Sequence, residues 1–459
     1  MITLDKDQLA AMARINEGKN VFLTGAAGTG KSSVTVEMIR RRLGERSLKV
    51  CATTGVAALN LRDKLAALFG QDVETSTIYR WSGIGIGPRP EQSFGDYYEW
   101  MSKRGYAWAG TCSRIRGTKM LVIDEISMLP GRTLDFIDYV CRCVRGNDLP
   151  FGGIQVVAVG DFLQLPPVSK TGTYDWAFQS AAWELADFCA ASLRTVHRQA
   201  DGEFVGLLNM FREGHVTRDG AALLKSRVAM FPDKDLLRLL THNAQVDKWN
   251  GYQLNCIEKP EIVLTADGDG PTDEVAWLQK NLVTPTVLRI KDGARVMITA
   301  NLPDANVGPG GGLAAANGDM GTVLGYDGKM VSVKLDSGKV LYVQPHKWEF
   351  DPTSEHETGY FQQFPLRLAW AATIHKSQGL TLDRALVDIR AAREPGQAYV
   401  ALSRVRGLPG LFMKDMFKGV WVSDEAREFH RKIEAGWGDN VATIKTAEPA
   451  FTLTSEEDY

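Results

Sequence analysis

The chain of 459 residues is long enough for about three folded units at roughly 150 residues each. Hydrophobic residues make up 44% of it and charged residues 24%, which argues against a largely disordered, fibrous or disulfide-stapled protein. The formal net charge of −2 provides no global basic field, so any binding of a polyanion must be local.

The first strong pattern is a strand, a glycine loop and a helix over residues 20–43. The loop reads Gly25-x-x-x-x-Gly30-Lys31-Ser32, a phosphate-binding loop in the context that it requires. Its backbone N–H groups can face phosphate oxygens, Lys31 adds a charge near the outer phosphates, and the Ser32 hydroxyl can bind Mg²⁺. The predicted nucleotide-binding residues here are Gly25, Ala26, Ala27, Gly28, Thr29, Gly30, Lys31, Ser32 and Ser33.

Short apolar runs with the character of buried parallel strands follow, separated by segments long enough for crossover helices. They span residues 48–53, 120–123 and 154–159. The stretch 83–110 breaks the alternation, because it is rich in glycine and aromatic residues, and we expect an irregular insertion there. The pattern predicts an α/β unit with a parallel sheet.

Two strand ends in this unit carry candidate chemistry. Asp124 and Glu125 follow the run 120–123; Asp124 can hold Mg²⁺ through water, and Glu125 can orient or deprotonate an attacking water. Such a pair alone commonly caps a helix, but beside the phosphate loop it predicts an ATPase centre. Gln164 follows the run 154–159 and can hydrogen-bond a γ-phosphate, although the prolines after it also fit a loop of fixed course.

The second half of the chain predicts another α/β unit with its own sheet. Its strands are expected at residues 236–241, 295–299 and 384–389. From 303 to 365 the apolar residues alternate between turn signals at Asp327-Gly328 and Ser337-Gly338, which predicts hairpins of a small inserted antiparallel barrel. Residues 446–459 are polar and acidic, which is typical of a frayed tail.

The cysteines and the first residues of the chain indicate the cellular compartment of the protein. The six cysteines are scattered, which favours a reducing compartment, and Cys141 and Cys143 lack a second ligand pair, so we expect no structural metal. The first residues have neither a secretion signal nor a transit composition, and no apolar run is long enough to cross a membrane. We expect a cytoplasmic protein without membrane contact.

Three segments together resemble the signature of the PIF-type (petite integration frequency) DNA helicases. They are Glu125-Ile-Ser-Met-Leu-Pro-Gly, Asp148-Leu-Pro-Phe-Gly-Gly-Ile-Gln155 and Gly160-Asp-Phe-Leu-Gln-Leu-Pro-Pro-Val168. These helicases have two RecA-like domains and run 5′ to 3′ along DNA. The resemblance covers roughly residues 4–415, and the compact length indicates a bacterial or phage member of the family.

Further motifs match this family in chain order. Gln8 resembles the glutamine that reads adenine, 52–58 and 77–84 resemble two strand-contacting motifs, and 197–199 resembles the arginine-bearing motif that opens the second domain. The remaining matches are the fifth motif at residues 366–379 and the sixth at residues 396–404.

The resemblance implies roles for individual residues. Catalysis is assigned to Lys31, Asp124, Glu125, Gln164, Arg198 and Arg404. Gln8 and Gly379 join the nucleotide-binding set, and Ser32 and Asp124 hold Mg²⁺. Arg198 and Arg404 lie on the second unit, so they reach the γ-phosphate only when the units close, unless they are buried structural arginines.

The DNA contacts implied by the resemblance avoid base reading, as a translocase requires. They are Thr54, Gly55, Thr77, Trp81, Thr373, His375, Lys376 and Ser377. The chain departs from the family at Tyr79 and Trp81, where His and Phe are usual, and at the longer spacing over 62–74.

The insertion at 83–110 is expected to act as a wedge. Its candidate aromatic residues are Tyr97, Tyr98, Trp100, Tyr106 and Trp108, and the alternative is that they form the insertion's own small core. Stacking of a freed base on an aromatic ring is worth about 1 to 3 kcal/mol, enough to offset much of the local cost of opening a base pair.

We therefore predict an α/β protein with two RecA-like P-loop domains that contain parallel sheets, a wedge insertion and an inserted antiparallel β-barrel. The predicted division is 1–190 for the first domain, 191–430 for the second with the barrel at 303–365, and 431–459 for a tail. The predicted function is a monomeric, ATP- and Mg²⁺-dependent 5′-to-3′ DNA helicase acting on single-stranded DNA and tailed duplex. The alternatives are a translocase that does not unwind and an ATP-switched binding module; a preference for quadruplexes, RNA–DNA hybrids or forks is left open.

Overall fold

The computed structural model describes residues 4–437 apart from 71–72, 86, 90, 170, 198–200, 229–232, 234–235, 304–312, 351–356 and 379. Arg198 and Gly379 of the predicted site, and the tail at 446–459, lie outside the described residues. None of the described helices has both the length and the apolar character needed to cross a bilayer.

The first RecA-like domain has a six-stranded parallel sheet. Its strands are β1 (Val21–Gly25), β2 (Leu48–Ala52), β3 (Thr75–Thr77), β4 (Met120–Asp124), β5 (Gln155–Val159) and β6 (Cys189–Leu193), in the order β3-β2-β4-β5-β1-β6. The three runs predicted after the phosphate loop are confirmed as β2, β4 and β5. The predicted boundary at 190 falls inside β6.

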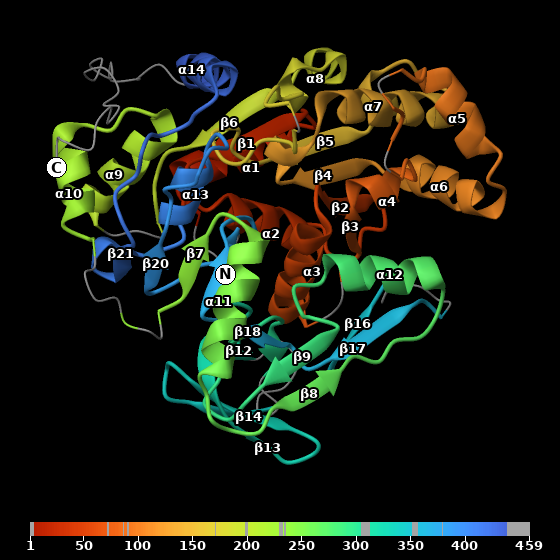
Figure 1. The fold of residues 1–459 in the computed structure, drawn as a ribbon. Helices are drawn as coiled ribbons and strands as arrows, with labels where there is room; N and C mark the ends of the chain where they lie inside the picture. The colour runs from red at the N-terminus through yellow and green to blue at the C-terminus, as the bar shows by residue number, and fades with distance from the viewer. Residues whose placement is uncertain are drawn as a thin grey trace.

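Helices cover both faces of this sheet (Figure 1). They are α1 (Lys6–Asn16), α2 (Lys31–Arg41), α3 (Gly55–Phe69), α4 (Ile78–Ser82), α5 (Phe94–Ser102), α6 (Tyr106–Gly117), α7 (Gly131–Arg145) and α8 (Ala181–Ala186). Alternate residues of a strand point to opposite faces. Val21 and Leu23 of β1 therefore pack with α1, α2 and α3, whereas Phe22 packs with α4, α7 and α8.

The insertion is helical rather than irregular, which corrects the expectation for 83–110. Ser93 caps α5 by accepting a hydrogen bond from the Asp96 N–H at 3.1 Å, and α6 follows. Phe94 and Tyr98 of α5 pack on the aromatic residues of α7. Phe94 lies 5.1 Å from Phe136 between ring centroids. The insertion therefore extends the core of the first domain.

The second RecA-like domain has a four-stranded parallel sheet. Its strands are β7 (Arg238–Leu240), β19 (Ala371–Thr373), β20 (Ala385–Val387) and β21 (Leu411–Met413), in the order β19-β7-β20-β21. Its helices are α9 (Gly202–Glu213), α10 (Arg218–Lys225), α11 (Asn243–Asn255) and α13 (Gln397–Leu402). The strands predicted at 236–241 and 384–389 are confirmed as β7 and β20.

The strand expected at 295–299 belongs to a different sheet. β10 (Arg295–Ile298) pairs antiparallel with β13 (Met320–Tyr326) and β18 (Leu366–Leu368). All four residues of β10 are buried, so its apolar run has the same appearance as a buried parallel strand. The assignment of this run to the second parallel sheet was wrong for that reason.

The antiparallel region begins before residue 303, at β8 (Ile262–Thr265), which pairs with β9 (Val287–Ile290). Its main sheet has the order β15-β14-β13-β10-β18, with β14 (Val331–Leu335) and β15 (Val340–Val343). Gly328 and Gly338 have φ of 94° and 89° in the two predicted hairpin turns. Among the described residues no ladder joins the edge strands β15 and β18, so no ladder closes this main sheet into the barrel that the sequence predicts.

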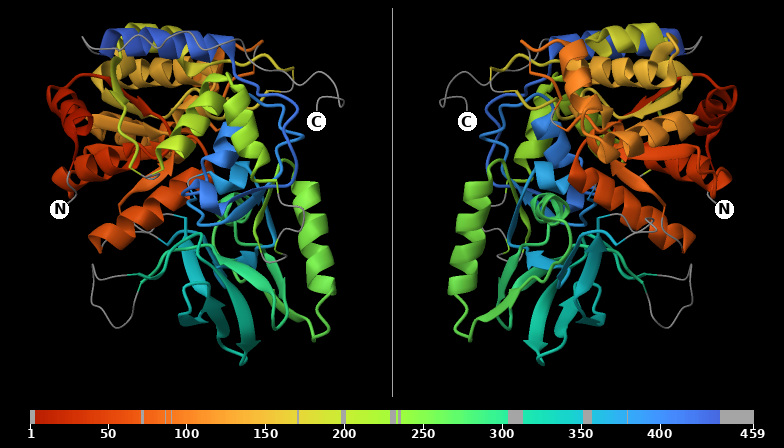
Figure 2. Two further views of the ribbon diagram at one scale, coloured as in Figure 1. Left: turned by 90° about the vertical axis from the view of Figure 1, so that its left-hand side faces the viewer. Right: turned by 90° about the vertical axis from the view of Figure 1, so that its right-hand side faces the viewer.

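Two further ladders and a helix flank this sheet. They are β11 (Leu302–Pro303) with β12 (Leu313–Ala315), β16 (His346–Glu349) with β17 (Tyr360–Gln363), and α12 (Thr272–Asn281). Figure 2 shows the whole antiparallel region projecting from one side of the two RecA-like domains.

The last described helix, α14 (Asp424–Trp437), returns to the first domain and lies beside β6 (Figure 1). Phe429 stacks on Phe178 with ring centroids 4.2 Å apart and an interplanar angle of 8°. Ala426 is buried in the core of the first domain. Residues 424–437 therefore pack on the first domain. The predicted division had assigned them to the second domain up to residue 430 and to a tail from residue 431.

Candidate active site

The phosphate loop joins β1 to α2. Gly25, Gly28 and Gly30 have φ of 149°, 84° and 84°, values that glycine adopts at little cost. A side chain at Gly30 would place its Cβ 2.3 Å from Gln8 Nε2, so the Gln8 amide would have to move. Residues 25–33 form this loop and the first turn of α2, whose N-terminal N–H groups suit a phosphate.

The loop's own polar groups are engaged by two side chains. Lys31 Nζ donates to the carbonyl oxygens of Gly25 at 2.7 Å and Ala26 at 3.1 Å. Burial lowers the pKa of Lys31, and the charges of Asp161 and Glu125 oppose that shift. The Ala27 N–H donates to the Tyr399 hydroxyl at 2.6 Å, and Tyr399 belongs to α13 of the second domain. The second domain thus reaches the phosphate loop directly.

Gln8 lies at the edge of the same loop and is buried. Its Oε1 accepts from the Asp5 N–H at 3.0 Å in the capping box of α1, and its Nε2 donates to the Thr29 carbonyl at 3.2 Å. His197, next to the undescribed Arg198, donates its N–H to the Gly28 carbonyl at 2.8 Å. Gln8 and His197, the first residue of the motif at 197–199, are therefore both adjacent to the phosphate loop.

Asp124 and Glu125 stand at the carboxyl end of β4. Glu125 has φ 55° and ψ 41°, a left-handed conformation that is uncommon for a residue with a side chain. Burial and the neighbouring Asp124 together raise the pKa of Glu125 to about 7, against the opposing charges of Lys31 and Arg404. Gln378 of the second domain donates its Nε2 to Glu125 Oε2 at 3.1 Å. A carboxylate with this pKa suits a general base at neutral pH.

Gln164 is buried in the segment after β5. Its Nε2 donates to Asp161 Oδ2 at 3.3 Å, and Asp161 forms a two-bonded ion pair with Arg212 of α9. Gly396 approaches Gln164 closely, since a Cβ there would lie 2.3 Å from the Gln164 carbonyl oxygen. The second domain therefore contacts Gln164 by its backbone and through Asp161.

Arg404 is buried at the end of α13. Its Nε donates to the Val400 carbonyl at 2.9 Å and its Nη2 to the Ser403 hydroxyl at 2.8 Å. Its charge lowers the pKa of Glu125 in the first domain. This geometry is compatible with both readings of Arg404, a structural arginine and a group that acts on the nucleotide.

A cleft of about 380 Å³ brings together the two domains and the antiparallel region. Its lining includes Ser32, Asp124 and Glu125 of the ATP site, Thr54 of the first domain, and His375 and Lys376 of the second. Asn301 and Asn317 close it from the antiparallel region, and Asn317 Nδ2 donates to Asn60 Oδ1 of α3 at 2.9 Å. The cleft thus links the predicted ATP and DNA sites.

Other predicted DNA contacts lie outside this cleft. Thr77 caps α4 by accepting from the Arg80 N–H, Trp81 is packed in the core at 2% exposure, and the Ser377 hydroxyl donates to the Ile374 carbonyl at 2.7 Å. Thr373 and Gly55 are also buried. The DNA-contact roles of these five residues stay predictions, whereas Thr54, His375 and Lys376 already face a common space.

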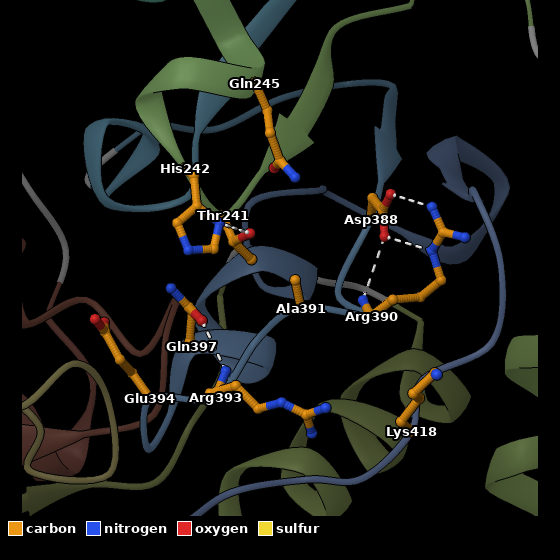
Figure 3. Close-up of a pocket in the computed structure, with 10 residues that line it drawn as sticks. All are labelled: Thr241, His242, Gln245, Asp388, Arg390, Ala391, Arg393, Glu394, Gln397 and Lys418. Carbon is orange, nitrogen blue, oxygen red and sulfur yellow. Dashed lines mark hydrogen bonds and ion pairs between the residues drawn. The ribbon is translucent and has the colours of Figure 1, made fainter. Parts of the chain in front are cut away.

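A second cavity, of about 610 Å³, lies at the carboxyl ends of β7 and β20 (Figure 3). β7 and β20 are neighbours in the sheet; the strand that follows β7 in the chain, β19, lies on one side of this pair, and the strand that follows β20, β21, lies on the other side. The boundary between β7 and β20 is therefore the topological switch point of the sheet, where α/β proteins commonly bind ligands. Its basic side chains are Arg390, Arg393 and Lys418. Glu394 also lines it and pairs with His375 Nε2 at 2.9 Å, so the two cavities meet at that pair.

Sequence reasoning missed three of these residues. Tyr399 and Gln378 lie inside the sixth and fifth motifs, and their polar side chains could have marked them as candidate site residues. Arg212 stands in an amphipathic helix, where an arginine is unremarkable, and its partner is 51 residues away.

Comparison with known proteins gives a consistent result. A family model described as an AAA domain matches residues 3–231. The chain is 34% identical over 413 residues to the ATP-dependent DNA helicase Pif1 of Bdellovibrio bacteriovorus, which covers 90% of this chain and 88% of that protein. It is 32% identical to human ATP-dependent DNA helicase PIF1, over 93% of this chain and 63% of the human protein.

Solved structures agree. Pif1 from Bacteroides in complex with ADP-AlF4 superposes with a TM-score of 0.77 at 29% identity, covering 95% of this chain and 98% of the other. Unliganded Pif1 from Bacteroides gives 0.75, at 29% identity over 96% and 100% of the two chains. Bacteroides Pif1 bound to single-stranded DNA gives 0.63, at 30% identity over 95% and 98%. The phosphate loop, the carboxylates of β4 and the relatives with their matching length lead to one conclusion: the chain belongs to the Pif1 helicase family.

Proposed function

We infer that this chain is an ATP-dependent DNA helicase that hydrolyses ATP between its two RecA-like domains and moves 5′ to 3′ on single-stranded DNA. One observation carries the inference. Side chains of the second domain, Tyr399 and Gln378, hydrogen-bond to the phosphate loop and to Glu125 of the first. An ATPase centre assembled across a domain boundary couples nucleotide turnover to domain movement.

In the proposed reaction, Glu125 accepts a proton from the attacking water, because its pKa of about 7 lets it do so at neutral pH. Lys31 stabilises charge on the outer phosphates once it leaves the carbonyls of Gly25 and Ala26. Gln164 contacts the γ-phosphate, and Arg404 and Arg198 act from the second domain. Gln8 reads the base from the edge of the loop.

The side chains at the ATP site are suited to binding Mg²⁺. The exposed Ser32 hydroxyl and the Asp124 carboxylate line the same cleft and are oxygen ligands of the kind this cation prefers. Within the described part of the chain, no group of three or more His, Cys, Asp or Glu side chains could hold a metal. That arrangement suits an ion that is bound mainly by nucleotide phosphates and water, where it would neutralise the developing negative charge.

We propose that single-stranded DNA runs along the 380 Å³ cleft past Thr54, His375 and Lys376. The strand then passes the His375–Glu394 pair and reaches the basic side chains around the second cavity (Figure 3). Lys376, Arg393 and Lys418 offer charge and hydrogen bonds to phosphates, whereas the Arg390 guanidinium is bonded to Asp388 and Asp415. Phosphate contacts of this kind support binding that is independent of base sequence.

Unwinding requires an element that meets the duplex. Of the insertion's aromatic residues, Trp100 is 51% exposed, whereas Tyr97, Tyr98 and Trp108 pack against the first-domain core. We propose Trp100 as the aromatic residue that meets the duplex. We propose a monomer as the working unit and tailed duplexes as the substrates.

The deciding experiment measures unwinding of duplexes that carry a 5′ tail, a 3′ tail or no tail, together with ATP turnover with and without DNA. We expect DNA-stimulated turnover and unwinding from the 5′ tail only. Stimulated turnover without unwinding would indicate a translocase, and turnover that DNA does not change would indicate an ATP-switched binding module. Unwinding from a 3′ tail alone would contradict the proposed polarity.

A further inference from the structure

A buried ion pair joins the two RecA-like domains beside the phosphate loop. Asp161 follows β5 in the first domain, and Arg212 lies in the last turn of α9 in the second. Arg212 Nη2 donates to Asp161 Oδ1 at 2.9 Å and Arg212 Nε to Asp161 Oδ2 at 3.0 Å. The two side chains are only 7% and 1% exposed. A two-bonded pair fixes orientation as well as distance, so the end of α9 and the Asp161 loop are held to one another.

The same carboxylate holds Gln164. Asp161 Oδ2 accepts from Gln164 Nε2 at 3.3 Å, and Asp161 Oδ1 accepts from the Leu163 N–H at 3.2 Å. Burial alone would raise the pKa of Asp161, but the charge and hydrogen bonds of Arg212 lower it to about 2. The carboxylate is therefore charged at neutral pH, and it connects Gln164 to α9 through a single group.

Arg212 is held from its other side by α14. Its Nη1 lies 3.2 Å from His430 Nε2, and burial together with the charge of Arg212 lowers the pKa of His430 to about 4. The neutral imidazole can accept the hydrogen bond of the guanidinium. Since α14 is anchored on the first domain through Phe429 and Phe178, the arginine of the second domain is enclosed by first-domain contacts on two sides.

We propose that Arg212 is a positioning residue for ATP turnover, which acts through Asp161 to set the position of Gln164 and to transmit the state of Gln164 to α9 and the second domain. The proposal rests on the proposed ATPase function of the site. When the Gln164 amide turns toward a phosphate, Asp161 loses that donor and keeps Arg212 and the Leu163 N–H. When phosphate leaves, the bond to Gln164 re-forms. The α9 end would thus register each change at Gln164.

The test is the double variant Asp161→Asn with Arg212→Met, which removes the pair without leaving one buried charge unpaired. Its matched control is Asp138→Asn with Arg142→Met, a pair of similar chemistry within α7 with Asp138 2% and Arg142 33% exposed. Thermal unfolding, affinity for a fluorescent ADP analogue, and turnover with and without single-stranded DNA are measured for both variants. The single variant Arg212→Lys keeps the charge but loses the two-bonded geometry.

We expect the Asp161/Arg212 double variant to fold and to bind the ADP analogue, with DNA stimulation of turnover reduced about tenfold or more, a size usual for coupling between sites. Arg212→Lys should come closer to the parent in thermal stability than in DNA stimulation of turnover. The α7 control should keep the parent's DNA stimulation. Parent-like stimulation in the Asp161/Arg212 variant would overturn the proposal and leave the pair a structural role. A parent protein that DNA does not stimulate would instead contradict the proposed function itself.

Discussion

The backbone N–H of Ala27 in the phosphate loop donates a hydrogen bond to the hydroxyl of Tyr399 in the second domain, at 2.6 Å. Tyr399 is 1% exposed, and burial raises its pKa to about 12, so the hydroxyl is protonated at neutral pH. A phosphate that takes the Ala27 N–H has to displace this hydroxyl. Nucleotide binding therefore competes with one contact between the domains.

The variant Tyr399→Phe should bind ADP more tightly, because the Ala27 N–H no longer has a protein partner to release. A neutral hydrogen bond contributes about 0.5 to 1.5 kcal/mol net, which corresponds to a gain of about two- to tenfold in affinity. Titration with a fluorescent ADP analogue measures it. Tyr360→Phe, in the antiparallel region, is the control and should have no effect. Unchanged affinity in Tyr399→Phe would show that the hydroxyl does not compete with nucleotide.

Glu125 should set the pH dependence of turnover. Its pKa is raised to about 7 by burial and by Asp124, so the base is protonated below that pH and ionised above it. For ATP, kcat/KM should therefore fall about tenfold per pH unit below about 7 and level off above it, as expected for one essential base. Glu125→Gln should abolish turnover while ATP still binds, whereas Lys31→Ala should lose affinity as well. A flat profile from pH 5 to 8 in the parent would argue against Glu125 as the base.

The local parts of this site could be predicted from the sequence, and the contacts between its halves could not. The phosphate loop and the Asp124-Glu125 pair follow from residue types at short, fixed spacing after a strand. The Tyr399–Ala27 bond joins residues 372 positions apart, and no spacing rule covers that distance. The strand at 295–299 shows the limit for the fold: four buried residues look alike in a parallel and an antiparallel sheet.

Replacing residues 317–350 by a short Gly/Ser linker should destabilise the protein rather than leave the ATPase intact. β13, β14 and β15 share one core with β10 and β18, to which Val323, Val331 and Val333 contribute fully buried side chains. Loss of one large buried side chain costs about 2 to 5 kcal/mol, and several together exceed a usual folding free energy of about 5 to 15 kcal/mol. Thermal unfolding checks this, with Lys329→Gly in the β13–β14 turn as the control. A deletion variant with the parent's melting temperature would contradict it.

Trp100→Ala and Tyr98→Ala should separate strand opening from folding. Trp100 is exposed and Tyr98 packs on Trp108 with ring centroids 5.3 Å apart, so of these two residues Trp100 is the one available to a base. Trp100→Ala should slow unwinding of a 5′-tailed duplex by up to the effect of one lost stacking contact, about 1 to 3 kcal/mol, with translocation unchanged. Tyr98→Ala should lower the melting temperature. Equal loss of unwinding and translocation in Trp100→Ala would assign the ring to strand grip.

Lys376→Ala should weaken binding of single-stranded DNA to the same extent for all base sequences, because we propose that this exposed lysine of the cleft pairs with a phosphate and not with a base edge. Each phosphate contact contributes about 0.7 to the slope of log affinity against log salt concentration on a single strand, so the slope should fall by about that amount. Lys418→Ala should give the same loss if the strand reaches the second cavity, whereas Lys432→Ala, on the exposed face of α14, should have no effect. Fluorescence anisotropy of labelled oligonucleotides at several salt concentrations measures the affinity of all three variants.

A loss of affinity with Lys376→Ala but none with Lys418→Ala would show that the DNA strand does not extend beyond the His375–Glu394 pair. A loss that depends on base sequence would contradict phosphate binding by Lys376.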